Sequence, residues 1–238
     1  MPSFGFFRGA RPIYRVEAGK VPAFPADPMS LVPRPDGLVG LGGELTVEGV
    51  LEAYKKGIFP WTGAPPIPWY SPDPRMILEP SAVVVSRSLR QVIQRGELRV
   101  EANRDFVGMM LMCATTPRPG QGGTWITPNM VQVWGELHRL GYAHSVEVYQ
   151  GDGPDSKRVG GLYGLSIGRA FFGESMCSHV PNASKVALVW LCRKLEAEGF
   201  AFIDCQQETP HLASMGARPI PRADYVRWVM QATQEDGR

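Results

Sequence analysis

The sequence predicts an α+β fold in which a small mixed amino-terminal domain precedes a larger domain with an antiparallel-rich sheet. Hydrophobic residues switch between helical and alternating spacing along the chain. Proline and glycine cluster in the first third, whereas three extended runs, a helix and a further strand fill the second half. We therefore expect an irregular arm over residues 1–35, an aromatic, glycine- and proline-rich domain over 36–85, and the larger domain over 86–238.

The composition excludes several classes of protein. The 238 residues are 44% hydrophobic and 20% charged, as in ordinary globular domains. The formal net charge of +2 is too small to indicate a nucleic-acid partner by itself. No stretch approaches the roughly 18 apolar residues of a membrane span, and residues 1–8 lack the apolar run of a signal peptide, so we expect a cytoplasmic protein that contacts no membrane. The four cysteines are scattered, which favours buried thiols over a metal site or disulfides.

The amino-terminal third contains one predicted helix between stiff segments. Five prolines between residues 22 and 35 fix backbone angles, so the chain before Asp36 should be extended or irregular. Thr46 can cap a helix whose apolar positions repeat at helical spacing as far as Tyr54, and Gly57 can end it. A proline-stiffened loop then carries four aromatic residues between positions 59 and 70. This loop is too rigid to be a linker.

Three helices and a meander are predicted next. The patterns favour helices over residues 86–95 and 106–114. Thr127 followed by Pro128 is a strong helix start, and that helix should extend to Gly141. The runs beyond it, joined by turns at residues 151–155 and at Gly168, indicate an antiparallel meander of three strands: 143–149, 159–167 and 170–176.

A long helix and a buried strand complete the pattern. Asn182 can cap a helix that continues to about Glu198 and ends at Gly199. Residues 200–205 then read as a buried strand whose polar end emerges at Asp204 and Gln206. Three strands, a helix and a strand in this order suggest a layer like that of acyltransferases.

Two familiar motifs are matched only in part. Residues 164–168 fit the G-x-S-x-G of serine hydrolases, which requires a strand, a tight turn and then a helix. The residues after Gly168 instead read as a strand, so Gly168 should be a hairpin residue. Residues 158–164 resemble the pyrophosphate loop of coenzyme A acetyltransferases but contain one residue too many. They also lie on a predicted strand rather than at a helix start, where anions bind.

Acidic and aromatic residues together indicate a functional site. Glu174 follows one apolar strand and Asp204 ends another, and carboxylates in such places are costly unless they are paired or used. Either alone is explained equally well by structural capping, but both together favour a site. Trp61, Trp69 and Trp125 can stack nucleic-acid bases, each contact being worth roughly 1–3 kcal/mol, although core packing is the commoner fate of tryptophan.

Collinear motifs resemble those of the leucyl/phenylalanyl-tRNA protein transferase family. They follow the family order from about Asp36 to Tyr225, and the set is far more specific than any one of its members. Tyr70 and Leu162 depart from the family pattern, which has tryptophan and methionine there, and the loop between Trp61 and Trp69 is shortened. The matching segments are residues 37–45, 53–54, 57–61, 69–75, 123–127, 144–147, 160–164, 172–176, 182–185 and 203–206.

The resemblance implies both a fold and an activity. The carboxy-terminal part would have a GNAT/FemABX-like acyltransferase fold, as in peptidoglycan peptide-adding enzymes. The donors would be Leu-tRNA and Phe-tRNA, with methionine accepted weakly, and the acceptors would be proteins that begin with Arg or Lys and are thereby marked for degradation under the N-end rule. Neither a metal nor an organic cofactor is expected, and we expect a monomer. A coenzyme A-dependent N-acetyltransferase and a non-catalytic RNA-binding module are the alternatives.

The resemblance also assigns roles to residues of this chain. Asp204 and Gln206 would be the catalytic pair, Asp204 orienting the ammonium and Gln206, and Gln206 steering the attacking amine. Glu174 would hold either the donor's α-amine or the acceptor's cation. Contacts to the terminal adenosine of tRNA would come from Trp61, Trp69, Trp125, Tyr54, Phe59 and Trp134. The pocket for the donor side chain would be formed by Leu162, Phe171, Gly173, Met176, Ser184, Leu188 and Ile203.

Overall fold

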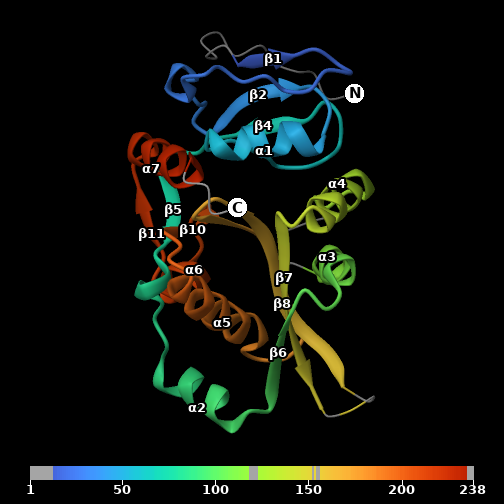
Figure 1. Ribbon diagram of the computed structural model, residues 1–238, viewed down its shortest axis with the longest axis vertical. Helices are drawn as coiled ribbons and strands as arrows, with labels where there is room; N and C mark the ends of the chain where they lie inside the picture. The colour runs from blue at the N-terminus through green and yellow to red at the C-terminus, as the bar shows by residue number, and fades with distance from the viewer. Residues whose placement is uncertain (1–12, 118–122, 152, 154–155, 235–238) are drawn as a thin grey trace.

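The computed structural model describes residues 13–117, 123–151, 153 and 156–234, which form two sheets with helices around them (Figure 1). Residues 1–8, and part of the predicted turn at 151–155, lie outside the described residues. The small sheet has the strand order β1-β2-β4-β3 and the large one has the order β11-β5-β10-β9-β8-β7-β6. The molecule is therefore a mixed α/β protein with one small and one large sheet.

The bounds of the elements are as follows. The small sheet contains β1 (Tyr14–Val16), β2 (Leu38–Gly42), β3 (Phe59–Pro60) and β4 (Pro68–Tyr70). The large sheet contains β5 (Arg75–Leu78), β6 (Leu98–Ala102), β7 (Ala143–Gln150), β8 (Lys157–Ile167), β9 (Ala170–Ser178), β10 (Phe202–Gln206) and β11 (Arg218–Ile220). The helices are α1 (Val47–Lys55), α2 (Arg87–Arg95), α3 (Phe106–Thr115), α4 (Pro128–Arg139), α5 (Ala183–Ala197), α6 (Pro210–Ser214) and α7 (Arg222–Gln234), with 3-10 turns η1 (Pro28–Ser30) and η2 (Pro80–Ala82).

Local sequence signals place most helix ends. The hydroxyls of Thr46, Ser86 and Thr127 each accept a hydrogen bond from a backbone N–H in the first turn of α1, α2 and α4. Asn182 precedes α5 as predicted but does not cap it, because its backbone is left-handed, with φ of 71°, and its side chain makes no capping bond. Ser178 Oγ, at the end of β9, instead accepts from the N–H of Ser184 at 2.8 Å.

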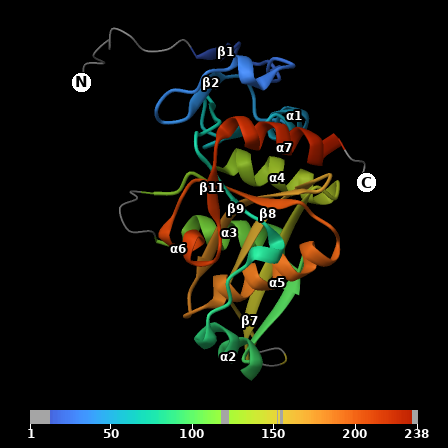
Figure 2. The same ribbon diagram turned by 90° about the vertical axis from the view of Figure 1, so that its left-hand side faces the viewer.

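The meander of β7, β8 and β9 is the centre of the large sheet. These strands pair antiparallel, and β10 joins β9 in parallel, so the predicted order of three strands, a helix and a strand is confirmed. Side chains alternate across the sheet. Helix α5 lies on one face of these strands and helix α3 on the other (Figure 1 and Figure 2). Leu162 and Phe171 pack in a core cluster with residues of α5, whereas Tyr163 and Phe172 pack with residues of α3, α4 and the small sheet.

The structure corrects the predicted boundaries at two places and adds elements that were not predicted. Strand β5 lies within the range 36–85 assigned to the small domain, yet it pairs with β10 and β11 in the large sheet. The arm is not wholly irregular, because β1 pairs in parallel with β2. Strands β1 to β6, strand β11 and helices α6 and α7 were not predicted, and β3 and β4 lie in the segment that was expected to be a stiff loop. Among the described residues, no helix is both long enough and apolar enough to cross a membrane.

Candidate active site

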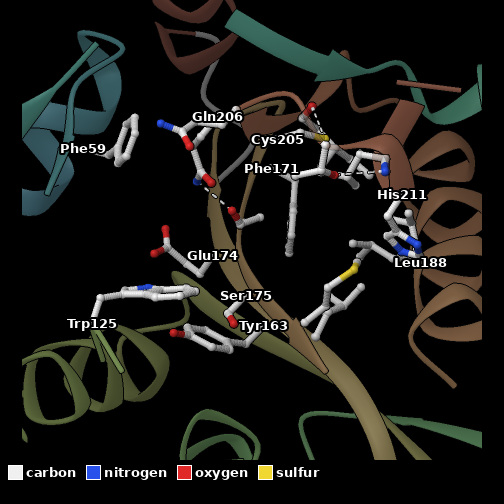
Figure 3. A pocket seen from close by; sticks show the side chains of 18 of the residues that line it. Phe59, Trp125, Tyr163, Phe171, Glu174, Ser175, Leu188, Cys205, Gln206 and His211 are labelled. Atoms are coloured by element: carbon white, nitrogen blue, oxygen red, sulfur yellow. Dashed lines mark hydrogen bonds between the residues drawn. The ribbon is translucent and has the colours of Figure 1, made fainter. Parts of the chain in front are cut away.

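A cavity of about 640 Å³ lies where the small sheet, the start of α4 and the strands β8 to β10 meet (Figure 3). Phe59, Trp61 and Trp125 form an aromatic wall. Glu174 and Gln206 supply polar groups. An apolar wall is formed by Leu162, Phe171, Met176, Leu188, Leu191 and Ile203. The cavity therefore brings together an aromatic, an apolar and a polar surface.

Two β-bulges adjust the strands at the polar wall. Between β8 and β9 the register passes from Tyr163 opposite Ser175 to Gly164 opposite Gly173, which leaves Glu174 as the extra residue. Between β10 and β5 the register passes from Asp204 to Gln206, which leaves Cys205 as the extra residue. Bulges redirect side chains and are frequent near active sites. Here they direct Glu174 and Gln206 into the cavity.

Glu174 is held by a hydrogen bond from behind the cavity wall. Tyr54 Oη, from α1, donates to Glu174 Oε1 at 2.6 Å. Burial raises the pKa of Glu174 to about 8; the hydrogen bond from Tyr54 and the charge of Arg75 oppose this rise, and the charge of Asp204 adds to it. Burial and the nearby Glu174 raise the pKa of Tyr54 well above its ordinary value, so its hydroxyl stays a donor. Near neutral pH, Glu174 therefore exchanges readily between its neutral and charged forms.

Asp204 lies behind the cavity in a polar cluster that satisfies its carboxylate with hydrogen bonds. Its side chain is 0% exposed. Arg75 donates to it from Nε at 2.8 Å and from Nη2 at 2.6 Å, and Tyr225 Oη donates at 2.8 Å. Although burial alone lowers the pKa of Arg75, the charge of Asp204 raises it above its usual value. Arg75 therefore stays charged, and the acceptor positions of Asp204 are occupied by Arg75 and Tyr225.

Gln206 faces the cavity in an unusual backbone conformation. Its φ of 58° is in the left-handed region, and its N–H donates to Asp204 Oδ1 at 2.9 Å. The side-chain Nε2 donates to the carbonyl of Gly173 at 2.6 Å. The amide oxygen is thus the part of this side chain that is positioned to accept a hydrogen bond from a ligand.

The aromatic wall joins segments that are far apart in sequence. The rings of Trp61 and Trp125 have centroids 6.3 Å apart, and Trp61 is 37% exposed. Thr62 Oγ1 donates to the carbonyl of Trp125 at 3.1 Å, which ties the loop after β3 to the loop before α4. Ring faces at a cavity mouth suit a planar base.

Comparisons with known proteins identify the family. A family model described as leucyl/phenylalanyl-tRNA protein transferase matches residues 77–230, and its N-terminal domain model matches residues 43–73. The chain belongs to the leucyl/phenylalanyl-tRNA protein transferase family. A relative of that name from Thiobacillus denitrificans is 52% identical over 81% of this chain and 82% of its own length. The relative from Nitratidesulfovibrio vulgaris strain DP4 is 48% identical over 86% of each chain. The relative from Anaeromyxobacter sp. strain K is 48% identical over 94% of this chain and 93% of its own length.

Membership makes the chain an aminoacyltransferase and decides against the two alternatives. The partial motifs agree with this: residues 158–164 lie within strand β8, and Gly168 is in the turn between β8 and β9. A solved structure titled L-PGS from Bacillus licheniformis matches with a TM-score of 0.37 and 9% identity, over 74% of this chain and 57% of that one. That likeness is too weak to support an argument.

The structure collects most of the predicted site residues around one cavity. The exceptions need correction. Trp69 and Trp134 are 0% exposed and present no face to a base; the indole N–H of Trp69 donates to the carbonyl of Gly42. Tyr54 is 1% exposed and does not line the cavity, so it supports Glu174 rather than contacting a base. Ser184 bonds to Ser178 rather than lining the cavity. Asp204 has no exposed surface with which to contact an ammonium, because Arg75 and Tyr225 cover it.

Other residues of the site were missed by sequence reasoning. Arg75 and Tyr225 complete the buried cluster, and Cys205 and His211 line the cavity. A cation at the start of the apolar run 75–78 is a signal that was available for Arg75. The predicted buried thiols are confirmed for Cys113, Cys177 and Cys192, while Cys205 is half-buried. In the described part of the chain no three His, Cys, Asp or Glu side chains are grouped to hold a metal ion.

Proposed function

We propose that this chain transfers a leucyl or phenylalanyl group from the 3′ end of a charged tRNA to the amino terminus of a protein that begins with Arg or Lys. The acceptor is thereby marked for degradation under the N-end rule. The enzyme would act in the cytoplasm as a monomer, without metal or organic cofactor. The observation that carries the proposal is the single cavity onto which an aromatic wall, an apolar wall, Glu174 and Gln206 all open.

The donor would occupy the two hydrophobic surfaces. Its side chain would lie against Leu162, Phe171 and Leu188, where apolar burial favours leucine and phenylalanine. The terminal adenosine would stack between or against Trp61 and Trp125. Because a missing methylene changes binding by only about 1–3 kcal/mol, methionine should be accepted as a weaker donor.

The chemical step needs positioning more than a strong base. The amine nitrogen attacks the ester carbonyl carbon, the new C–N bond forms, the ester C–O bond breaks, and the proton lost from nitrogen goes to the departing 3′-oxygen. A free α-amine has a pKa of about 7.7, so much of it is nucleophilic near neutral pH. Near-attack placement supplies roughly 7–11 kcal/mol, whereas general-base assistance gives about 10²–10⁴-fold. The Gln206 oxygen would accept from the amine, and Glu174 would hold a cationic group of a substrate.

The large sheet would be a GNAT/FemABX-like acyltransferase layer. Its central antiparallel strands β7 to β9, with β10 added in parallel after helix α5, support that proposal. The bulges of β9 and β10 lie where the two strands border the cavity. Such a layer would provide a rigid support for the reacting groups.

A direct transfer assay tests the proposed function. Radiolabelled Leu-, Phe-, Met- and Val-tRNA are each mixed with the enzyme and a peptide that begins with Arg, and the product is separated by chromatography. We expect labelled peptide from Leu- and Phe-tRNA, less from Met-tRNA, and least from Val-tRNA. A peptide that begins with Gly is the matched control. Stimulation by acetyl coenzyme A, or the absence of any labelled peptide, would contradict the proposal.

The pH dependence of acceptor use should report Glu174. With a pKa of about 8, the carboxyl group is about one tenth ionised at pH 7 and about nine tenths ionised at pH 9. Only the ionised form attracts a cation, so its contribution is present above this pKa and is lost as the pH falls through it. Because the acceptor amine titrates in the same range, the wild type is compared with Glu174→Gln. We expect the kcat/KM of the wild type for an Arg peptide, divided by that of Glu174→Gln, to rise about tenfold between pH 7 and pH 9. A ratio independent of pH would rule out this role for Glu174.

A further inference from the structure

We propose that Arg75 and Tyr225 are positioning residues that act through Asp204 on Gln206, and that Asp204 exchanges no proton with the substrates. The inference rests on the proposed function, in which Gln206 steers the attacking amine. It gives a role to two residues that do not touch the cavity contents, and it changes the role of Asp204 from a group that meets the substrate to one that supports it.

The first observation is that the Asp204 carboxylate has no vacant acceptor position. Oδ1 accepts from Arg75 Nε at 2.8 Å and from the N–H of Gln206 at 2.9 Å. Oδ2 accepts from Arg75 Nη2 at 2.6 Å and from Tyr225 Oη at 2.8 Å. Four donors fill the roughly four lone-pair sites of a carboxylate. With 0% of its surface exposed, Asp204 has no access to a proton on a substrate.

The second observation is that Arg75 connects three separate parts of the chain. The residue begins β5, its Nη1 donates to the carbonyl of Gly57 at 3.2 Å just after α1, and its Nη2 reaches Tyr225 Oη of α7 at 3.3 Å. The guanidinium also lies 4.7 Å from the ring centroid of Phe59 and 4.4 Å from that of Tyr225. Arg75 therefore contacts both the aromatic wall, through Phe59, and the bulged strand β10, through Asp204.

The third observation is the conformation that this cluster maintains. A non-glycine residue at φ of 58° is uncommon and persists when its surroundings hold it there. The bond from the Gln206 N–H to Asp204 Oδ1 fixes the backbone, and the bond from Nε2 to the Gly173 carbonyl fixes the side chain. If Asp204 turned away, the Gln206 oxygen would lose its direction towards the amine.

Charge-neutral replacement of the pair separates positioning from proton transfer. Asparagine at 204 keeps an oxygen for the Gln206 N–H but is no base, and glutamine at 75 keeps donors without the charge. Each single variant, Arg75→Gln or Asp204→Asn, leaves a buried charge without its partner, and we expect kcat to fall by about 100-fold. The double variant Arg75→Gln/Asp204→Asn has no unpaired charge. Its kcat should recover to within about tenfold of the wild type, which is the non-additivity expected of residues in contact.

Two further readouts make the result decisive. The KM for Leu-tRNA should stay within about twofold in Asp204→Asn, because Asp204 lines neither wall that binds the donor. Tyr225→Phe removes one donor to Asp204 and keeps the ring over Arg75, so kcat should fall by only about 3- to 10-fold, the effect of one hydrogen bond. It also tests the cluster if the single charge variants fail to fold.

Defined outcomes would overturn the inference. A double variant that folds but is as inactive as Asp204→Asn would show that the carboxylate itself takes part in proton transfer, and an unchanged kcat in Tyr225→Phe would show that the cluster does not position Gln206. If the wild type transfers no label to an Arg peptide, the proposed function fails instead, and the variants are not informative about it.

Discussion

Replacing Asp204 by alanine is expected to lower the free energy of unfolding by about 3–5 kcal/mol, because it leaves the Arg75 guanidinium buried without a counter-charge. Arg75 is 1% exposed and Asp204 is 0% exposed, so water cannot replace the lost partner. The measurement is urea unfolding at pH 7, followed by circular dichroism, with the midpoint and the slope fitted separately.

An exposed ion pair provides the matched control. Arg139 Nη2 and Glu136 Oε1 are also 2.6 Å apart, but their side chains are 70% and 42% exposed. Glu136→Ala should therefore change stability far less than Asp204→Ala, because water and salt screen an exposed ion pair. A similar small loss for Asp204→Ala would contradict the view that burial makes the Arg75 pair indispensable. An apolar double replacement, Arg75→Met with Asp204→Leu, should restore much of the lost stability, since no charge remains to be desolvated.

Truncating either tryptophan of the aromatic wall should weaken binding of the charged tRNA. Loss of one stacking contact costs roughly 1–3 kcal/mol, so Trp61→Ala or Trp125→Ala is expected to raise the Kd for Leu-tRNA by about 5- to 150-fold. The KM for the acceptor peptide should be unchanged. Because the two rings lie 6.3 Å apart, the effects in a double variant should not add. Fluorescence anisotropy with labelled tRNA measures the affinity.

The tryptophan prediction has a surface control and a clear contrary result. Leu140→Ala removes an exposed apolar side chain at the end of α4, away from the cavity lining, and should leave the Kd unchanged. If Trp61→Ala and Trp125→Ala bind Leu-tRNA as well as Leu140→Ala does, the aromatic wall does not hold the adenosine. Repeating the titration with a short aminoacylated 3′-end fragment should give the same loss, because the contact is predicted to be to the terminal nucleotide.

Much of the fold was accessible from local patterns. The capping hydroxyls of Thr46 and Thr127 predicted the starts of α1 and α4 correctly, because capping involves residues only a few positions apart. The meander was likewise predicted from alternating residues and turns. Strand β5 was misassigned to the small domain because its partners, β10 and β11, lie more than a hundred residues further along the chain.

The sequence predicted which residues belong to the site better than it predicted what each of them does. Motif resemblance named Glu174, Gln206 and the aromatic wall, and the structure gathers them around one cavity. It also named Trp69, Trp134 and Asp204 as contacts, but their complete burial gives them other neighbours. A motif records which residue types occur together, whereas exposure depends on every element that packs above them.

The sequence by itself determined the family, the helix ends and the central strands, since these depend on residue identity and on spacing over a few residues. The tertiary structure alone decided that Asp204 faces Arg75 and Tyr225 rather than a substrate, and that a bulge directs Glu174 into the cavity. The physical reason is that both facts depend on contacts between segments far apart in the chain. The desolvation of a carboxylate, and the partners that compensate it, exist only once those segments have packed together.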